Sequence, residues 1–177
     1  MTSKLIYDDL SNRSGDFDYS GVCLLLTKAL ENECKSRFYK GYLKYMSKNY
    51  GNNTNNYPLW FISRNLKNHH EVLLSENEFT LGTMAYATGY LKRRDDNSDL
   101  FLTMNDYCYE ELFINKDEKY IASTLRQIGQ QVNEVTNSFR NPAAHIQPMS
   151  KIKAEECFKY LIEVQKLIQK ILLNCKY

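Results

Sequence analysis

Apolar residues recur along most of this chain at the spacing of an α-helix, and this periodicity limits the possible folds more than any other feature. The first stripe, within residues 18–50, starts with Val22, Leu25, Leu26, Ala29 and Leu30. Similar stripes fill residues 117–139 and 150–174. With only 7 Gly and 3 Pro in 177 residues, the chain lacks the turns that a β-sandwich needs. The sequence therefore predicts an all-α fold, an up-and-down bundle of four or five helices.

The segments between these stripes have weaker patterns. The Gly- and Asn-rich residues 51–56 predict a loop, and residues 59–74 fit one helical face. A capping-box pattern at 75–78 predicts the start of a helix that continues through Tyr90. Residues 99–114 predict another short apolar helix.

The sequence lacks the features that would predict export, a membrane span or a second domain. Residues 1–18 form a polar lead-in without the apolar stretch of a signal peptide, and no apolar run reaches the length of a membrane span. The five cysteines are scattered and include no C-x-x-C, which argues against a disulfide framework or a zinc site. We therefore expect one domain over residues 1–177, located in the cytoplasm and not associated with a membrane.

The net charge of +2 conceals two segments of opposite sign. Residues 35–70 contain seven Lys and Arg and no Asp or Glu, whereas residues 71–118 contain eleven Asp and Glu against four Lys and Arg. A chain with this distribution can attract a polyanion to one side, or its two segments can pair with each other.

Within the basic segment, four cations share one helical stripe and alternate with aromatic residues. The cations are Arg37, Lys40, Lys44 and Lys48. The aromatic residues are Tyr39, Tyr42, Tyr45, Tyr50, Tyr57 and Trp60. Because cations bind phosphates and aromatic faces stack on bases, this segment predicts an RNA-binding surface. The alternative interpretation is a solvated face whose aromatic residues belong to the core.

The residues best suited to chemistry lie between the last two predicted helices, at Arg140, Asn141 and His145. Proline is tolerated in the first turn of a helix and asparagine is a good cap, so the sequence predicts a helix break at Asn141 and a new turn from Pro142. An unbroken helix would turn through about 500° between Arg140 and His145 and point them to different sides. A break can bring both side chains into one cleft.

The segment 140–145 resembles the active-site motif of the HEPN ribonuclease family. Members of this family are helical bundles with an Arg-x(4–6)-His motif, often with a polar residue directly after the Arg. The early stripe around residues 28–31 is also similar to the first long helix of that family. Residues 64–69 match the motif as well, ending at His69. We prefer the later match because it lies between two long helices and contains a proline.

The resemblance implies a metal-independent endoribonuclease that cleaves single-stranded RNA by attack of the 2′-hydroxyl, in a toxin or antiviral defence role. The implied catalytic residues are Arg140, Asn141 and His145, with no cofactor and no metal. Histidine titrates near neutrality and can move protons, and a forked guanidinium suits the charge on the phosphorus oxygens.

The resemblance also implies partners. One motif supplies one histidine, so two motifs that face each other in a homodimer would supply both proton-transfer groups. An antitoxin or a larger effector chain is a further possible partner. Two alternatives remain: a non-catalytic HEPN module that binds a nucleotide, nucleic acid or partner protein, and a plain helical interaction protein.

Overall fold

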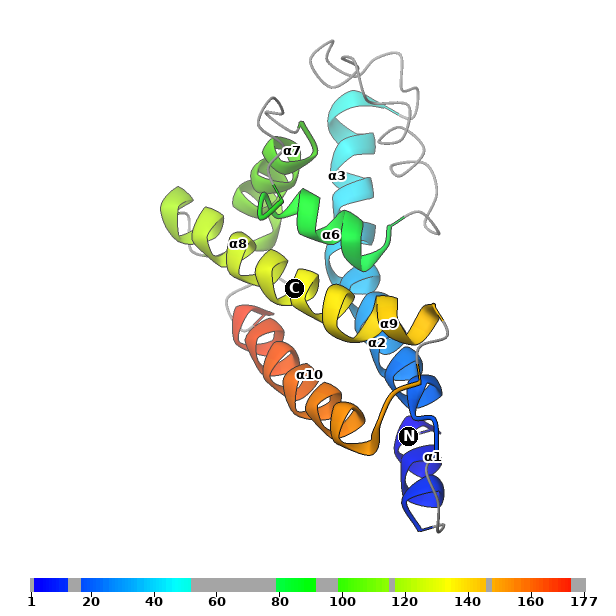
Figure 1. The fold of residues 1–177 in the computed structure, drawn as a ribbon. Coiled ribbons are helices and arrows are strands. Elements are labelled where there is room, and N and C mark those ends of the chain that lie inside the picture. Colours follow the sequence, from blue (N-terminus) through cyan, green and yellow to red (C-terminus); the bar gives the residue numbers. More distant parts are fainter. Residues whose placement is uncertain are drawn as a thin grey trace.

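The structure, a computed structural model, is all-helical in the part of the chain that it describes. The described residues are 2–12, 17–51, 79–91, 99–114, 117–145 and 148–172. Every regular element in them is a helix, and the helices pack as a bundle (Figure 1), so the predicted all-α fold is confirmed. Among these residues, no helix combines the length and the apolar composition that a membrane crossing requires.

Several predictions fall outside the described residues. They include most of the loop at 51–56, the helix at 59–74 and the capping box at 75–78. The second motif match at 64–69 and the aromatic residues Tyr57 and Trp60 also lie outside.

The first predicted stripe forms one long helical run. Its elements are α2 (Ser20–Cys34), the π-helical turn η1 (Lys35–Tyr39) and α3 (Lys40–Tyr50). The run begins beside Asp18, whose carboxylate accepts the backbone N–H groups of Ser20 at 2.8 Å and of Met149 at 3.0 Å. It ends at Gly51, whose φ of 76° is readily adopted by glycine alone. The start of α2 is thus tied to the segment that follows the motif.

Shorter helices pack against the upper part of this run (Figure 1). They are α6 (Leu81–Ala87), α7 (Asp99–Tyr107) and the π-helical turn η4 (Cys108–Leu112). The predicted helix through Tyr90 was wrong in its extent, because α6 covers only residues 81–87 and Thr80 before it is extended. The hydroxyl of Thr80 caps α6 by accepting the N–H of Thr83 at 3.3 Å, and Gly89 leaves the helical region with a φ of 70°.

The last two stripes form the helices that carry the motif. The first contains α8 (Glu118–Val135), the π-helical turn η5 (Thr136–Arg140) and α9 (Asn141–Ala144). Asp117 caps α8 by accepting the N–H groups of Lys119 and Tyr120 at 2.9 and 3.1 Å. The second stripe forms α10 (Lys151–Leu172), which runs back antiparallel to α8 and packs against it and α2 (Figure 1).

Residues 1–18 are more than a polar lead-in, because residues 2–11 form the helix α1 (Thr2–Ser11). Tyr7 attaches this helix to the bundle: its ring lies 5.8 Å from that of Tyr19 and 5.6 Å from that of Phe158. Its hydroxyl also donates to a carboxylate oxygen of Glu155 at 2.7 Å. These tertiary contacts stabilise a helix whose local sequence pattern is weak.

The buried side chains form two clusters, and the smaller one supports the motif. The larger cluster joins α2, η1 and α3 to α6, α7, η4, α8 and the later part of α10. The smaller one consists of Tyr19, Val22, Cys23, Phe139, Ala143, Met149, Ala154 and Cys157. The four described cysteines are free and buried, as expected for packed thiols.

Candidate functional site

The motif segment is helical through Ala144, so the predicted break at Asn141 was wrong. Arg140 has φ −67° and ψ −51°, and Asn141 has φ −67° and ψ −48°. The chain leaves the helix at His145, with φ −100° and ψ 28°. The N–H of His145 donates to the carbonyl of Asn141 at 3.0 Å.

The π-helical turn η5 explains why Pro142 does not end the helix. A proline ring normally clashes with the carbonyl four residues earlier, here that of Ser138, which lies within η5. In a π-helical turn the N–H groups bond five residues back, as the N–H of Asn141 does with the carbonyl of Thr136. This wider turn accommodates the ring while the helix continues.

The structure brings the side chains of Arg140 and Asn141 together, and His145 follows them at the end of the helix. Both Arg140 and Asn141 are half-buried, and Nη1 of Arg140 donates to Oδ1 of Asn141 at 3.1 Å. His145 is exposed. Because the helix is unbroken through Ala144, the geometry expected to bring Arg140 and His145 into one cleft of a single chain is absent.

Buried neighbours of the motif residues fix this segment to the bundle. Phe139 is 4% exposed and Ala143 is 8% exposed, and both belong to the smaller buried cluster. The ring of Phe139 lies 6.1 Å from the ring of Tyr160 and 5.0 Å from Nζ of Lys153, both on α10. The apolar residues therefore anchor the segment, and the polar motif residues lie at the surface or near it.

An open pocket of about 280 Å³ lies between Arg140 and α2. Its other lining residues all belong to α2: Leu24, Leu25, Thr27, Lys28 and Glu31. The η5 and α9 elements both contact α2, which places the motif beside this helix. The pocket thus combines two cations, one carboxylate and two partly exposed leucines, whereas His145 is not among the residues that line it.

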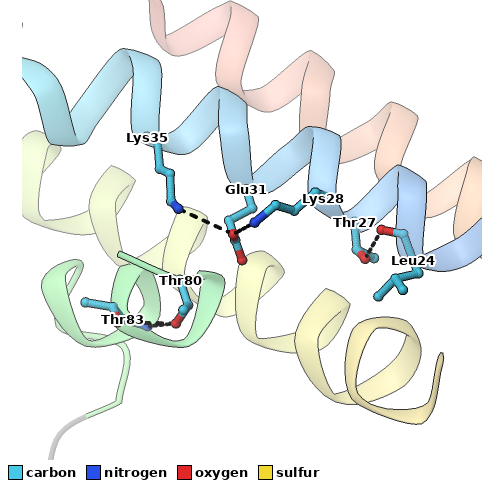
Figure 2. Close-up of polar contacts among 7 residues, drawn as sticks. All are labelled: Leu24, Thr27, Lys28, Glu31, Lys35, Thr80 and Thr83. Carbon is cyan, nitrogen blue, oxygen red and sulfur yellow. Dashed lines mark hydrogen bonds and ion pairs between the residues drawn. The ribbon is translucent and has the colours of Figure 1, made fainter. Parts of the chain in front are cut away.

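Glu31 is a buried carboxylate that two lysines share. Its Oε1 lies 2.5 Å from Nζ of Lys28 and 3.6 Å from Nζ of Lys35. Figure 2 shows both lysines reaching toward this carboxylate, on the side of α2 that faces the continuous run of α8, η5 and α9, called the motif helix below. The side chains of Glu31 and Lys35 are only 8% and 10% exposed, and charges buried to this extent need such partners.

Glu31 was not among the residues predicted from the sequence to form the site. The spacing of Lys28, Glu31 and Lys35 places all three on one helical face, which is a detectable signal. Lys35 belongs to the basic segment, but its ammonium group is buried against Glu31.

The four predicted RNA-binding cations have different surroundings. Arg37 is half-buried and pairs with Glu33, and Nζ of Lys48 lies 2.7 Å from Oε1 of Glu111 on η4. This hydrogen bond and the charge of Glu111 raise the pKa of Lys48. Lys40 and Lys44 are exposed on α3. Lys48 thus pairs with a residue of the acidic segment, as the charge distribution allowed.

The tyrosines between these cations belong to the core. Tyr39 and Tyr42 are 0% exposed and Tyr45 is 4% exposed. The ring of Tyr39 stacks on that of Phe79 at 4.4 Å, and the Tyr42 hydroxyl shares a hydrogen bond with that of Thr103 at 2.7 Å. The prediction that these three tyrosines stack on RNA bases is therefore wrong. Tyr50, the fourth described tyrosine of this segment, is half-buried.

The described part of the chain contains no group of three or more His, Cys, Asp or Glu side chains placed to hold a metal ion. In comparisons with known proteins, no family model, curated protein or solved structure matches this chain.

Proposed function

We propose that this chain is a HEPN-type endoribonuclease that cleaves single-stranded RNA by attack of a 2′-hydroxyl on the adjacent phosphate. The observation that carries the proposal is the guanidinium of Arg140, which lines an open pocket, donates to the side chain of Asn141 and lies five residues before an exposed histidine. A guanidinium oriented by its neighbour suits a phosphate in the transition state, where charge gathers on the phosphorus oxygens.

In the proposed reaction, the 2′-oxygen loses a proton and bonds to phosphorus while the bond from phosphorus to the 5′-oxygen breaks. The leaving 5′-oxygen takes up a proton. Arg140 stabilises the negative charge, Asn141 orients the guanidinium, and His145 transfers a proton. The products are a 2′,3′-cyclic phosphate and a 5′-hydroxyl, and the reaction uses neither a metal nor a cofactor.

The proposal includes a homodimer whose interface contains the region around Arg140 and His145. Each motif holds one histidine, and the unbroken helix separates it from the Arg140 of its own chain. A facing motif can supply the second proton-transfer group.

The same proposal includes a biological role. This chain would be a cytoplasmic toxin or antiviral defence protein, and an antitoxin or a larger effector would be a further partner. The RNA would extend from the motif over the exposed face of α3 that carries Lys40 and Lys44.

A second candidate is a non-catalytic HEPN module that binds a nucleotide, nucleic acid or protein. The observation that favours it is that Arg140 lines the pocket and His145 does not. In a binding module the cation would hold an anionic ligand, and no proton transfer would be required.

End-group analysis of the products separates the two candidates. Wild-type protein is incubated with 5′-labelled single-stranded RNA in the presence of EDTA. The endoribonuclease proposal predicts fragments that end in a 2′,3′-cyclic phosphate. Fragments with a 3′-hydroxyl and a 5′-phosphate, or cleavage abolished by EDTA, would contradict the proposed mechanism. RNA that is bound but not cut would favour the binding module.

A further inference from the structure

We propose that the pocket between α2 and the motif helix binds one phosphate group of an RNA strand through Lys28 and Arg140. Lys28 has no place in the catalytic motif, so this assigns a binding residue on a different helix. The inference rests on the proposed function, because it names how the same site holds its RNA.

The charge around the pocket favours an anionic ligand. Lys28 and Arg140 are the cations among the lining residues and Glu31 is the carboxylate, which leaves the lining with a net charge of +1. The buried ammonium of Lys35 also pairs with Glu31. The two lysines share Glu31, and the described hydrogen bond of the Arg140 guanidinium goes to a neutral amide, that of Asn141. A phosphate with one negative charge would offset this excess.

Both proposed ligands of the phosphate are held in place before it binds. Lys28 is 58% exposed, yet Glu31 fixes its ammonium group at the pocket, which reduces the entropy lost on binding. Asn141 accepts from one N–H of the Arg140 guanidinium, which has five in all. Solvent can reach the ammonium group of Lys28, whereas the Glu31 side chain that orients it is only 8% exposed.

The remaining pocket wall favours a nucleotide over a free phosphate. Leu24 and Leu25 lie at the pocket with their side chains partly exposed. The apolar faces of a ribose or a base can contact them, whereas inorganic phosphate has no apolar group to do so. A volume of about 280 Å³ also exceeds what a phosphate ion alone would fill.

The test measures the binding of a fully 2′-O-methylated single-stranded RNA, followed by fluorescence anisotropy at several salt concentrations. This RNA has no free 2′-hydroxyl and is not cut by the proposed reaction, so binding is measured separately from catalysis. The variant is Lys28→Ala. The matched control is Lys166→Ala, which removes the cation of another i, i+3 pair, Glu163–Lys166 on α10, away from the pocket.

Lys28→Ala should weaken binding about tenfold at low salt, the loss expected for one charged hydrogen bond. The slope of log K against log salt should become shallower by about 0.7, the value for one phosphate contact to a single strand. Lys166→Ala should change neither quantity. If Lys28→Ala keeps the wild-type affinity and slope, the phosphate site is wrong.

A competition with inorganic phosphate distinguishes the two sources of the ligand. An RNA strand is supported if millimolar phosphate displaces the methylated RNA only weakly, and less in Lys28→Ala than in wild type. Tight phosphate binding with an unchanged RNA salt slope in Lys28→Ala would mean that the pocket takes free phosphate, and would overturn the inference. If Lys28→Ala weakens binding but wild type cuts no RNA, the phosphate site stands and the endoribonuclease proposal fails.

Discussion

At the scale of single residues, the fold holds the three motif residues in different ways. Arg140 and Asn141 are half-buried and bonded to each other, whereas His145 is exposed at the helix end. Residue spacing was enough to select these three from the sequence. It could not show the burial of Glu31, because burial depends on helices that are distant in the chain.

Replacing Arg140 tests whether catalysis needs the two parallel N–H donors of its guanidinium. Arg140→Ala should lower kcat on single-stranded RNA by about two to three decades, because the phosphorane charge is left without its donor. Arg140→Lys should recover only a small part, since a point charge replaces two parallel N–H donors. Arg126→Ala is the control, because Arg126 is exposed on α8 and lies over the ring of Phe101. Full activity in Arg140→Lys would contradict the role given to the fork.

Asp18 should make stability depend on pH. Burial raises the pKa of its carboxyl, but hydrogen bonds from the N–H groups of Met149 and Ser20 and from the Ser20 hydroxyl outweigh this, and the net pKa is lowered. A carboxyl with a lowered pKa in the folded state stabilises the fold above the unfolded pKa, near 4, and loses this effect as pH falls through the folded pKa.

The corresponding variant is Asp18→Ala, compared with wild type by urea unfolding at pH 7 and at pH 3. The difference in unfolding free energy should be larger at pH 7 and should be smaller at pH 3, which is below the unfolded pKa, because the stabilisation is lost progressively as pH falls toward and through the folded pKa. An equal difference at both pH values would show that charge on Asp18 does not contribute.

At the scale of elements, the long helices could be predicted and the interruptions within them could not. The three stripes placed α2–α3, α8 and α10, because apolar periodicity extends over many residues. The π-helical turns η1, η4 and η5 shift that period by a single residue, which local patterns do not reveal. The short helices depend on single residues: Tyr7 attaches α1 to the bundle through Glu155, and the hydroxyl of Thr80 caps the start of α6.

Gly129 allows α8 to pack closely against the end of α6. A Cβ atom at this position would lie 2.0 Å from Oγ1 of Thr88, whose hydroxyl bonds to the carbonyls of Met84 and Ala85. Gly129→Ala should therefore destabilise the protein by about 1–3 kcal/mol, the usual cost of overpacking, despite the better helix propensity of alanine.

Thermal or urea unfolding measures this effect, with Gly21→Ala as the control. Gly21 is also helical, but a Cβ there would meet no atom within 4 Å, so this change should leave stability equal or raise it by about 0.4–1 kcal/mol. Equal stability of the two variants would mean that the contact between α8 and α6 is looser than described.

At the scale of the whole molecule, the ion pair between the basic and acidic segments and the motif lie on different elements of the described structure. Lys48 on α3 pairs with Glu111 on η4, which links the basic and acidic segments within one chain. The motif lies against the early part of α2, where Leu24 and Leu25 are partly exposed. Because Lys48 and Glu111 already pair within one chain, the proposed homodimer would form through the region around Arg140 and His145 and not through the charged segments.

Cleavage of single-stranded RNA by wild type and by His145→Ala, side by side, tests the proposed function most directly. Sedimentation and circular dichroism first establish that both proteins are folded dimers. His145→Ala should then lose about two to four decades of rate, the range for a missing general acid or base. His69→Ala, in the second motif match, should keep the wild-type rate. A folded, dimeric His145→Ala that cuts RNA as fast as wild type would contradict the catalytic assignment.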